Sequence, residues 1–115
     1  MSEDFGEKRK SVRVPVDFNA SFSKDNRDYS GQVLNLSSDG LFIKTQQLFE
    51  PHDRLDFSIK LSGSPQVLHL RGRVVWNGSI EGEDDRHYGI GIQFEDPPPA
   101  ETAVLSSYIR KLLKS

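Results

Sequence analysis

Two arginines, Arg9 and Arg13, stand four residues apart in the segment EKRKSVRVPV, and Lys8 and Lys10 flank the first of them. A guanidinium is a planar, permanently charged fork with five N–H donors, so a pair of them could hold an anionic ligand. The alternative interpretation is that these residues form an ordinary charged N-terminal tail with no binding role. Two arginines at this spacing arise by chance in many chains of this size, so the pair alone is a weak motif.

A second polar motif, NLSSDG, occupies residues 35–40. Asn35, Ser37 and Asp39 offer side-chain hydrogen bonds, and Gly40 allows either a positive φ or the close approach of another group. Taken alone, the motif is best interpreted as a plain turn between two strands.

The elements around the two motifs decide whether they can meet. Apolar residues alternate with polar ones from Val12 to Phe22, which predicts a half-buried strand, and Pro15 indicates an edge position or a bulge in it. The turn formers of residues 24–28 should reverse the chain into a second strand at about 29–36. In an antiparallel hairpin the start of one strand and the end of the next lie at the same end, so both motifs can converge on one rim.

The rest of the chain continues the strand pattern and then changes period. Further strands are predicted at residues 41–45, 55–61, 68–76 and 87–94, with Trp76 facing inward beside Val74 and a hairpin turn at Asn77–Gly78. The apolar residues of 99–114 form one stripe of an amphipathic helix. The expected fold is therefore all-β, a six-stranded antiparallel barrel (about 11–95) with a C-terminal helix (about 99–114).

Composition limits the function classes. The chain has 115 residues, a net charge of −2 and no cysteine, so we expect one domain (9–115) after a flexible tail (1–8), and no thiolate chemistry. The three histidines lack metal-ligand spacing, and neither a catalytic constellation nor a cofactor motif is apparent, so we expect a binding protein rather than an enzyme. Without a signal peptide or a long apolar run, we expect a cytoplasmic protein with no membrane insertion.

The two motifs together resemble the signature of the PilZ domain family, R-x-x-x-R followed by [D/N]-x-S-x-x-G. The segments VRVPV, GLFI, GRVVW (72–76) and YGIGIQF (88–94) also fit the pattern of this family. The resemblance covers nearly the whole chain from Arg9. It implies a six-stranded antiparallel barrel with a helix nearby, and a bacterial receptor for the second messenger cyclic di-GMP.

The resemblance also implies roles for individual residues. Cyclic di-GMP presents two phosphates and two guanines, and arginine can grip a phosphate or pair with the O6/N7 edge of guanine. By resemblance, Arg9 and Arg13 are expected to anchor phosphate and guanine. Asn35 and Ser37 are expected to hydrogen-bond a guanine, with Gly40 holding the turn open.

Lys8 and Lys10 stand where many family members carry a further arginine, so they are possible accessory contacts. Residues 1–11 are polar and are expected to be disordered without ligand. Binding at the two arginines would draw this segment across the mouth of the barrel and change the surface offered to an unidentified protein partner.

Two other functions stay open at this point. One is a PilZ-like protein-interaction module that does not bind nucleotide, against which the retained motifs count. The other is a small-barrel binder of single-stranded nucleic acid. We do not expect nucleic acid as a partner, because such binders need a basic groove with exposed aromatic residues. Here the net charge is negative and most aromatic residues are expected to point inward.

Overall fold

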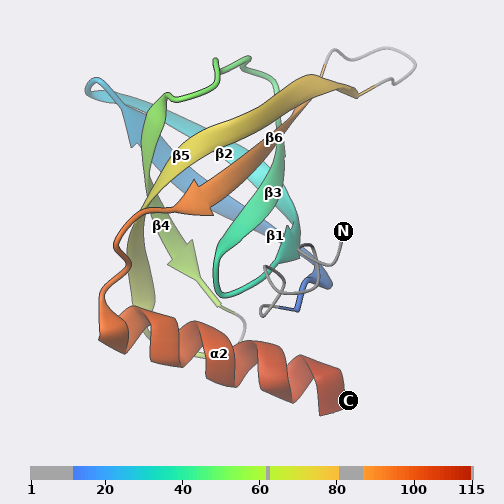
Figure 1. Ribbon diagram of the computed structural model, residues 1–115, viewed down its shortest axis with the longest axis vertical. Coiled ribbons are helices and arrows are strands. Elements are labelled where there is room, and N and C mark those ends of the chain that lie inside the picture. The colour runs from blue at the N-terminus through green and yellow to red at the C-terminus, as the bar shows by residue number, and fades with distance from the viewer. Residues whose placement is uncertain (1–11, 62, 81–86, 115) are drawn as a thin grey trace, which may run out of the picture.

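The computed structural model describes residues 12–61, 63–80 and 87–114. In chain order the elements are β1 (Val14–Lys24), β2 (Arg27–Leu36), β3 (Gly40–Thr45), β4 (Arg54–Lys60), β5 (Val67–Ile80), β6 (His87–Phe94) and α2 (Pro99–Lys114). The strands form a closed antiparallel barrel in the order β1-β2-β3-β6-β5-β4 (Figure 1). The predicted fold class is thereby confirmed.

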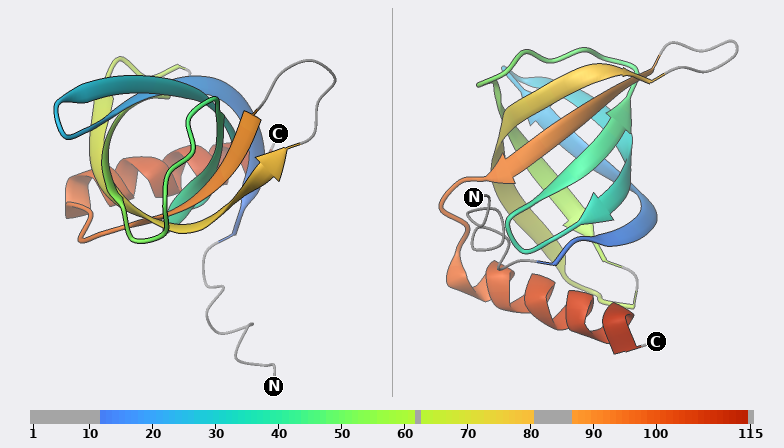
Figure 2. Two further views of the ribbon diagram at one scale, coloured as in Figure 1. Left: turned by 90° about the horizontal axis from the view of Figure 1, so that it is seen from above. Right: turned by 45° about the vertical axis from the view of Figure 1, so that its right-hand side comes forward.

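Alternation builds the core of the barrel. In β4 the pattern is strict, with Leu55, Phe57 and Ile59 buried and the residues between them exposed. The helix α2 lies across one end of the barrel, as the two views in Figure 2 show. It inserts Leu105 and Ile109 into the core, so the barrel is capped at that end. No helix in the described part of the chain is long and apolar enough to cross a membrane.

The β1–β2 hairpin sets the positions of Arg13 and of the NLSSDG motif. Asp25 and Asn26 adopt positive φ angles of 52° and 67°, the conformation of a two-residue hairpin turn that matches strand twist. From this turn the strands pair back through Pro15 opposite Asn35 to Val14 opposite Leu36. The register shifts between Pro15 and Phe18, which is the irregularity that the proline predicted.

The predicted turn at Asn77–Gly78 is wrong. Both residues lie inside β5, where they pair with Ile90 and Gly89 of β6. The Asn77 side chain donates a hydrogen bond to the carbonyl of Phe49 at 2.7 Å, which holds it in the strand. Strong local turn chemistry is overridden here by long-range pairing, and the chain reverses only after Ile80.

The predicted inward orientation of Trp76 is also wrong, since its side chain is 52% exposed. The register between β5 and β6 shifts between Val74 and Trp76, so one extra residue enters β5 at Val75. A bulge of this kind reverses which face the following residues occupy. Val74 stays in the core, and Trp76 is turned to the outside of the barrel.

Candidate functional site

A hydrogen bond joins the two polar motifs. Arg13 Nη1 donates to Asn35 Oδ1 at 2.8 Å. Asn35 is half-buried at the end of β2, and Arg13 is exposed just before β1. This bond uses one of five guanidinium N–H donors. Lys8, Arg9 and Lys10 lie outside the described residues, so the structure places one of the two arginines at this end of the β1–β2 hairpin.

The turn after β2 is built around Ser37, which is only 1% exposed. Its hydroxyl oxygen accepts hydrogen bonds from the backbone N–H groups of Asp39 at 3.1 Å and Gly40 at 3.2 Å. Its own N–H donates to the carbonyl of Gly40 at 2.9 Å. The backbone N–H of Phe94 donates to the carbonyl of Asp39 at 2.8 Å and ties the turn to β6. The buried Ser37 side chain therefore stabilises the conformation of the turn through its hydrogen bonds to the backbone.

Gly40 is required for strand packing. It is buried at the start of β3 opposite Gln93 of β6, and a side chain at this position would collide with the backbone carbonyl of Ile92. The sequence allowed either a positive φ angle or the close approach of another group at Gly40, and the structure shows the close approach. The glycine therefore brings β3 against β6 immediately beside the turn.

Asn35 belongs to a row of residues that crosses four strands on the outer face of the barrel. It pairs with Phe42 of β3, Phe42 pairs with Gly91 of β6, and Gly91 pairs with Trp76 of β5. Directly opposed residues of antiparallel strands project on the same face. Neighbouring strands are about 4.8 Å apart, so the row runs roughly 14 Å from Asn35 to Trp76. We call Asn35, Phe42, Gly91 and Trp76 the outer row.

The aromatic half of the outer row is preorganised. The rings of Phe42 and Trp76 lie with centroids 5.8 Å apart and planes tilted by 39°. The indole lies against Gly78, where an added Cβ would approach Trp76 Cη2 to 2.8 Å. Sequence reasoning missed this platform because alternation assigned Trp76 to the core. The glycines of β5 and β6 were a signal for it, since bare backbone lets flat rings lie on a sheet.

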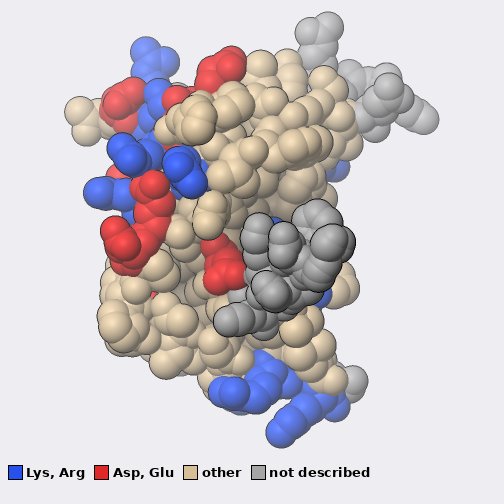
Figure 3. Space-filling model, in the orientation of Figure 1, with Lys and Arg blue, Asp and Glu red and all other residues tan. Residues whose placement is uncertain are grey.

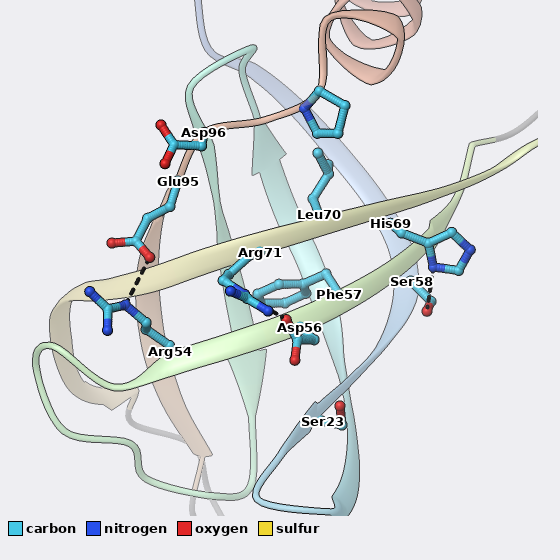
Figure 4. Close-up of a pocket in the computed structure, with 11 residues that line it drawn as sticks. Ser23, Arg54, Asp56, Phe57, Ser58, His69, Leu70, Arg71, Glu95 and Asp96 are labelled. Carbon is cyan, nitrogen blue, oxygen red and sulfur yellow. Dashed lines mark hydrogen bonds and ion pairs between the residues drawn. The ribbon is translucent and has the colours of Figure 1, made fainter.

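A separate cleft of about 660 Å³ lies on the outer face of β4 and β5 (Figure 4). Its cations are matched by acids: Arg54 bonds Glu95 at 2.9 Å, and Arg71 bonds Asp56 at 3.1 Å. Figure 3 shows basic and acidic side chains intermixed on this side of the barrel. Because the charges offset one another, the cleft offers little attraction to a dianionic ligand. Within the described ranges, no group of three or more potential ligand side chains could hold a metal ion.

A family model described as the PilZ domain matches residues 7–111. The chain belongs to the PilZ domain family. The matched range includes Arg9 and Arg13 as well as the turn at Ser37–Gly40, so both motifs lie within the matched region.

Solved structures share this PilZ fold at low sequence identity. The PilZ domain of YcgR from Escherichia coli, solved with c-di-GMP, is 15% identical with a TM-score of 0.74, covering 93% of this chain and 92% of that one. The Bacillus subtilis inhibitor of motility (MotI/DgrA) is 14% identical with a TM-score of 0.74, covering 93% of this chain and 52% of that one. The K. pneumonia MrkH–c-di-GMP complex is 11% identical with a TM-score of 0.74, covering 91% of this chain and 52% of that one.

The chain therefore spans about half the length of MotI/DgrA and MrkH and nearly all of the isolated YcgR domain. A sequence search of curated proteins finds no match. At these identities the structural likeness concerns the fold alone.

Proposed function

We propose that this PilZ domain is a cyclic di-GMP receptor that binds its ligand on the outer face of the barrel, around Arg9, Arg13 and Asn35. The observation that carries the proposal is the hydrogen bond between Arg13 and Asn35, which unites the two family motifs at one place. Two neighbours of the same fold, YcgR and MrkH, were solved with this ligand, which supports the choice.

The chemistry of the ligand suits this arrangement. Cyclic di-GMP carries two phosphates and two guanines, and a guanidinium can serve either group with paired hydrogen bonds. Arg13 is exposed, and its side chain is held at its position by the hydrogen bond to Asn35. Arg9 supplies a second guanidinium from the segment that precedes the barrel. Asn35 contributes an amide that can both donate to and accept from a guanine edge.

Ser37 and Gly40 act in this proposal mainly through the turn. The Ser37 hydroxyl is buried and engaged with the backbone of the turn, so its contribution to binding is to fix the position of Asn35 and Gly40. A direct contact from Ser37 to the ligand requires its hydroxyl to open toward the surface. Gly40 keeps the backbone of β3 close to β6 beside the turn.

The aromatic half of the outer row offers a stacking surface to one guanine. Phe42 is the cross-strand neighbour of Asn35, and the 52%-exposed Trp76 lies next to it. Stacking of a base on an aromatic side chain contributes about 1–3 kcal/mol. A dinucleotide held by Arg13 at one end of the row therefore gains a base contact at the other end.

The segment before β1 is proposed to order on binding. Lys8 and Lys10 add positive charge beside Arg9 and would strengthen attraction to the phosphates. Capture of Arg9 and Arg13 by one ligand would hold residues 8–13 against the barrel. We expect this change to alter the surface presented to a protein partner, which makes the domain an adaptor rather than an enzyme.

A calorimetric titration tests the assignment of the ligand. We expect saturable binding of cyclic di-GMP, with GTP and cyclic GMP as controls that do not compete at the same concentrations. If cyclic di-GMP gives no binding while the protein is folded, the chain is instead a PilZ-like interaction module that does not bind nucleotide.

A further inference from the structure

A groove of about 740 Å³ runs along α2, and no residue of the outer row lines it. One wall is the helix face formed by Ala103, Val104, Ser107, Tyr108, Lys111 and Leu112. The other wall is formed after β4 by Leu61, Gly63, Ser64 and Pro65. A Cβ added at Gly63 would meet no atom within 4 Å, so this wall is open toward solvent.

The groove is apolar in its floor and basic at one end. Val104, Tyr108 and Leu112 are half-buried and lie one helical turn apart, so they form a continuous apolar stripe. The C-terminal half of α2 carries Arg110, Lys111 and Lys114, and no acidic residue occurs from 102 to 114. Figure 3 shows Lys and Arg side chains gathered at this end of the helix. This local charge is opposite in sign to the net charge of −2.

We propose that this groove is a docking site for an acidic amphipathic helix of a partner protein. Apolar side chains of the partner would cover the stripe of α2, and its carboxylates would face Arg110, Lys111 and Lys114. The lining residues 103–112 of α2 extend over about 14 Å, or two and a half helical turns, which matches the length over which a groove-bound helix places its anchors. The proposal goes beyond cyclic di-GMP binding and does not depend on it.

The shape of the site favours a helix over a lipid surface. A bilayer surface is flat on this scale and would leave a groove with two walls unfilled. A helix that lies along the groove can contact both walls. The basic end of the groove explains why the partner helix is expected to be acidic, since its three cations attract carboxylates and repel amines.

The test uses the full-length chain without nucleotide and a short synthetic helical peptide with Leu and Phe along one face and Glu along both flanks. We expect amide chemical-shift changes confined to the groove residues Leu61, Gly63, Ser64 and 103–112. Lys111→Glu is expected to weaken the peptide affinity at least about fivefold, since an attraction becomes a repulsion. Arg27→Glu makes the same charge change at the tip of the β1–β2 hairpin and is expected to leave the affinity unchanged.

Several outcomes would overturn the proposal. The first is that the Glu peptide causes no chemical-shift changes. The second is that a peptide with Lys in place of Glu binds as tightly as the Glu peptide. The third is that Arg27→Glu weakens peptide binding as much as Lys111→Glu does. Two further outcomes assign the groove to this chain itself. One is a concentration-dependent dimer in sedimentation that involves the same resonances, and the other is a shift of those resonances when residues 1–7 are deleted. Binding of anionic phospholipid vesicles through Lys111 without binding of the peptide would assign the groove to a membrane surface.

Discussion

Arg13 and Asn35 are 22 positions apart in the chain and 2.8 Å apart in the structure, with the guanidinium donating to the amide oxygen. The β1–β2 hairpin produces this relationship, because its two-residue turn and antiparallel register bring the start of β1 opposite the end of β2. The arginine is thereby restricted before any ligand arrives. Restricting a rotamer-rich side chain in advance reduces the entropy that binding must overcome.

Replacing Asn35 with alanine tests whether this restriction matters for binding. We expect Asn35→Ala to weaken cyclic di-GMP binding at least about tenfold, because both a base contact and the position of Arg13 are lost. The free energy of unfolding should fall by no more than about 1 kcal/mol, since the bond is exposed. The measurements are calorimetric titration and chemical denaturation.

Asn19→Ala is the matched control, because Asn19 is an exposed asparagine on the outer face of the same hairpin, away from the outer row. It should leave affinity and stability near those of the unchanged protein. Equal affinities for the two variants would contradict the assigned role of Asn35.

Replacing Gly40 with alanine tests the close approach of β3 and β6. The new methyl group would collide with the carbonyl of Ile92, and backbone cannot give way as a side chain can. We expect Gly40→Ala to lower the free energy of unfolding by about 2 kcal/mol or more, with a corresponding fall in Tm. Thermal unfolding followed by circular dichroism measures this change.

Gly91→Ala provides the comparison on the neighbouring strand. An added Cβ there would lie 3.3 Å from the Cβ of Trp76, which is a tight contact but much less severe than the collision with the Ile92 carbonyl at Gly40. Its loss of stability should be clearly smaller than that of Gly40→Ala. The reverse order would show that Gly40 is not packed as described.

The fluorescence of the exposed Trp76 indole can be used to detect ligand binding at the outer row. Trp76 is the sole tryptophan of the sequence, and at 52% exposure its emission should be close to that of indole in water. Saturating cyclic di-GMP is expected to change the intensity of this emission. Trp76→Ala should weaken binding about five- to 150-fold, corresponding to loss of about 1–3 kcal/mol of stacking.

Val75→Ala serves as the control for Trp76→Ala, because Val75 is 50% exposed at the adjacent position of the same bulge. It should bind normally. Unchanged affinity in Trp76→Ala together with unchanged emission would remove the aromatic residues from the binding site.

Amide hydrogen exchange tests the proposed ordering of the segment before β1. Capture of Arg9 and Arg13 by one ligand should slow exchange of residues 5–13 when cyclic di-GMP is saturating. The amides of α2 are the internal reference, because no change is expected there from ordering of the N-terminal segment. Unchanged exchange in residues 5–13 would rule out the conformational change while leaving ligand binding itself intact.

Much of the fold could be predicted from local pattern. Strand β6 and helix α2 were expected at 87–94 and 99–114, and both have these bounds in the structure. Their signals are periodic and uninterrupted, so local and long-range preferences agree. The same agreement holds for the β1–β2 hairpin and hence for the meeting of Arg13 with Asn35.

The wrong turn at Asn77–Gly78 and the wrong orientation of Trp76 both lie in β5. Asn77 and Gly78 have strong turn propensity, yet the strand continues through them because β6 and the carbonyl of Phe49 supply partners. Trp76 was assigned to the core because the bulge at Val75 is a property of the pairing with β6, which no local pattern reveals. The aromatic part of the candidate site depends on that bulge, so it could not be predicted from alternation.

The most direct test of the central claim is calorimetric titration of cyclic di-GMP into the unchanged protein, Arg13→Ala and Arg13→Lys. We predict saturable binding to the unchanged protein and at least about tenfold weaker binding to Arg13→Ala. Arg13→Lys should also bind more weakly, because an ammonium keeps the charge but loses the planar fork. Near-native affinity in Arg13→Ala, or no binding to the folded unchanged protein, would contradict the account.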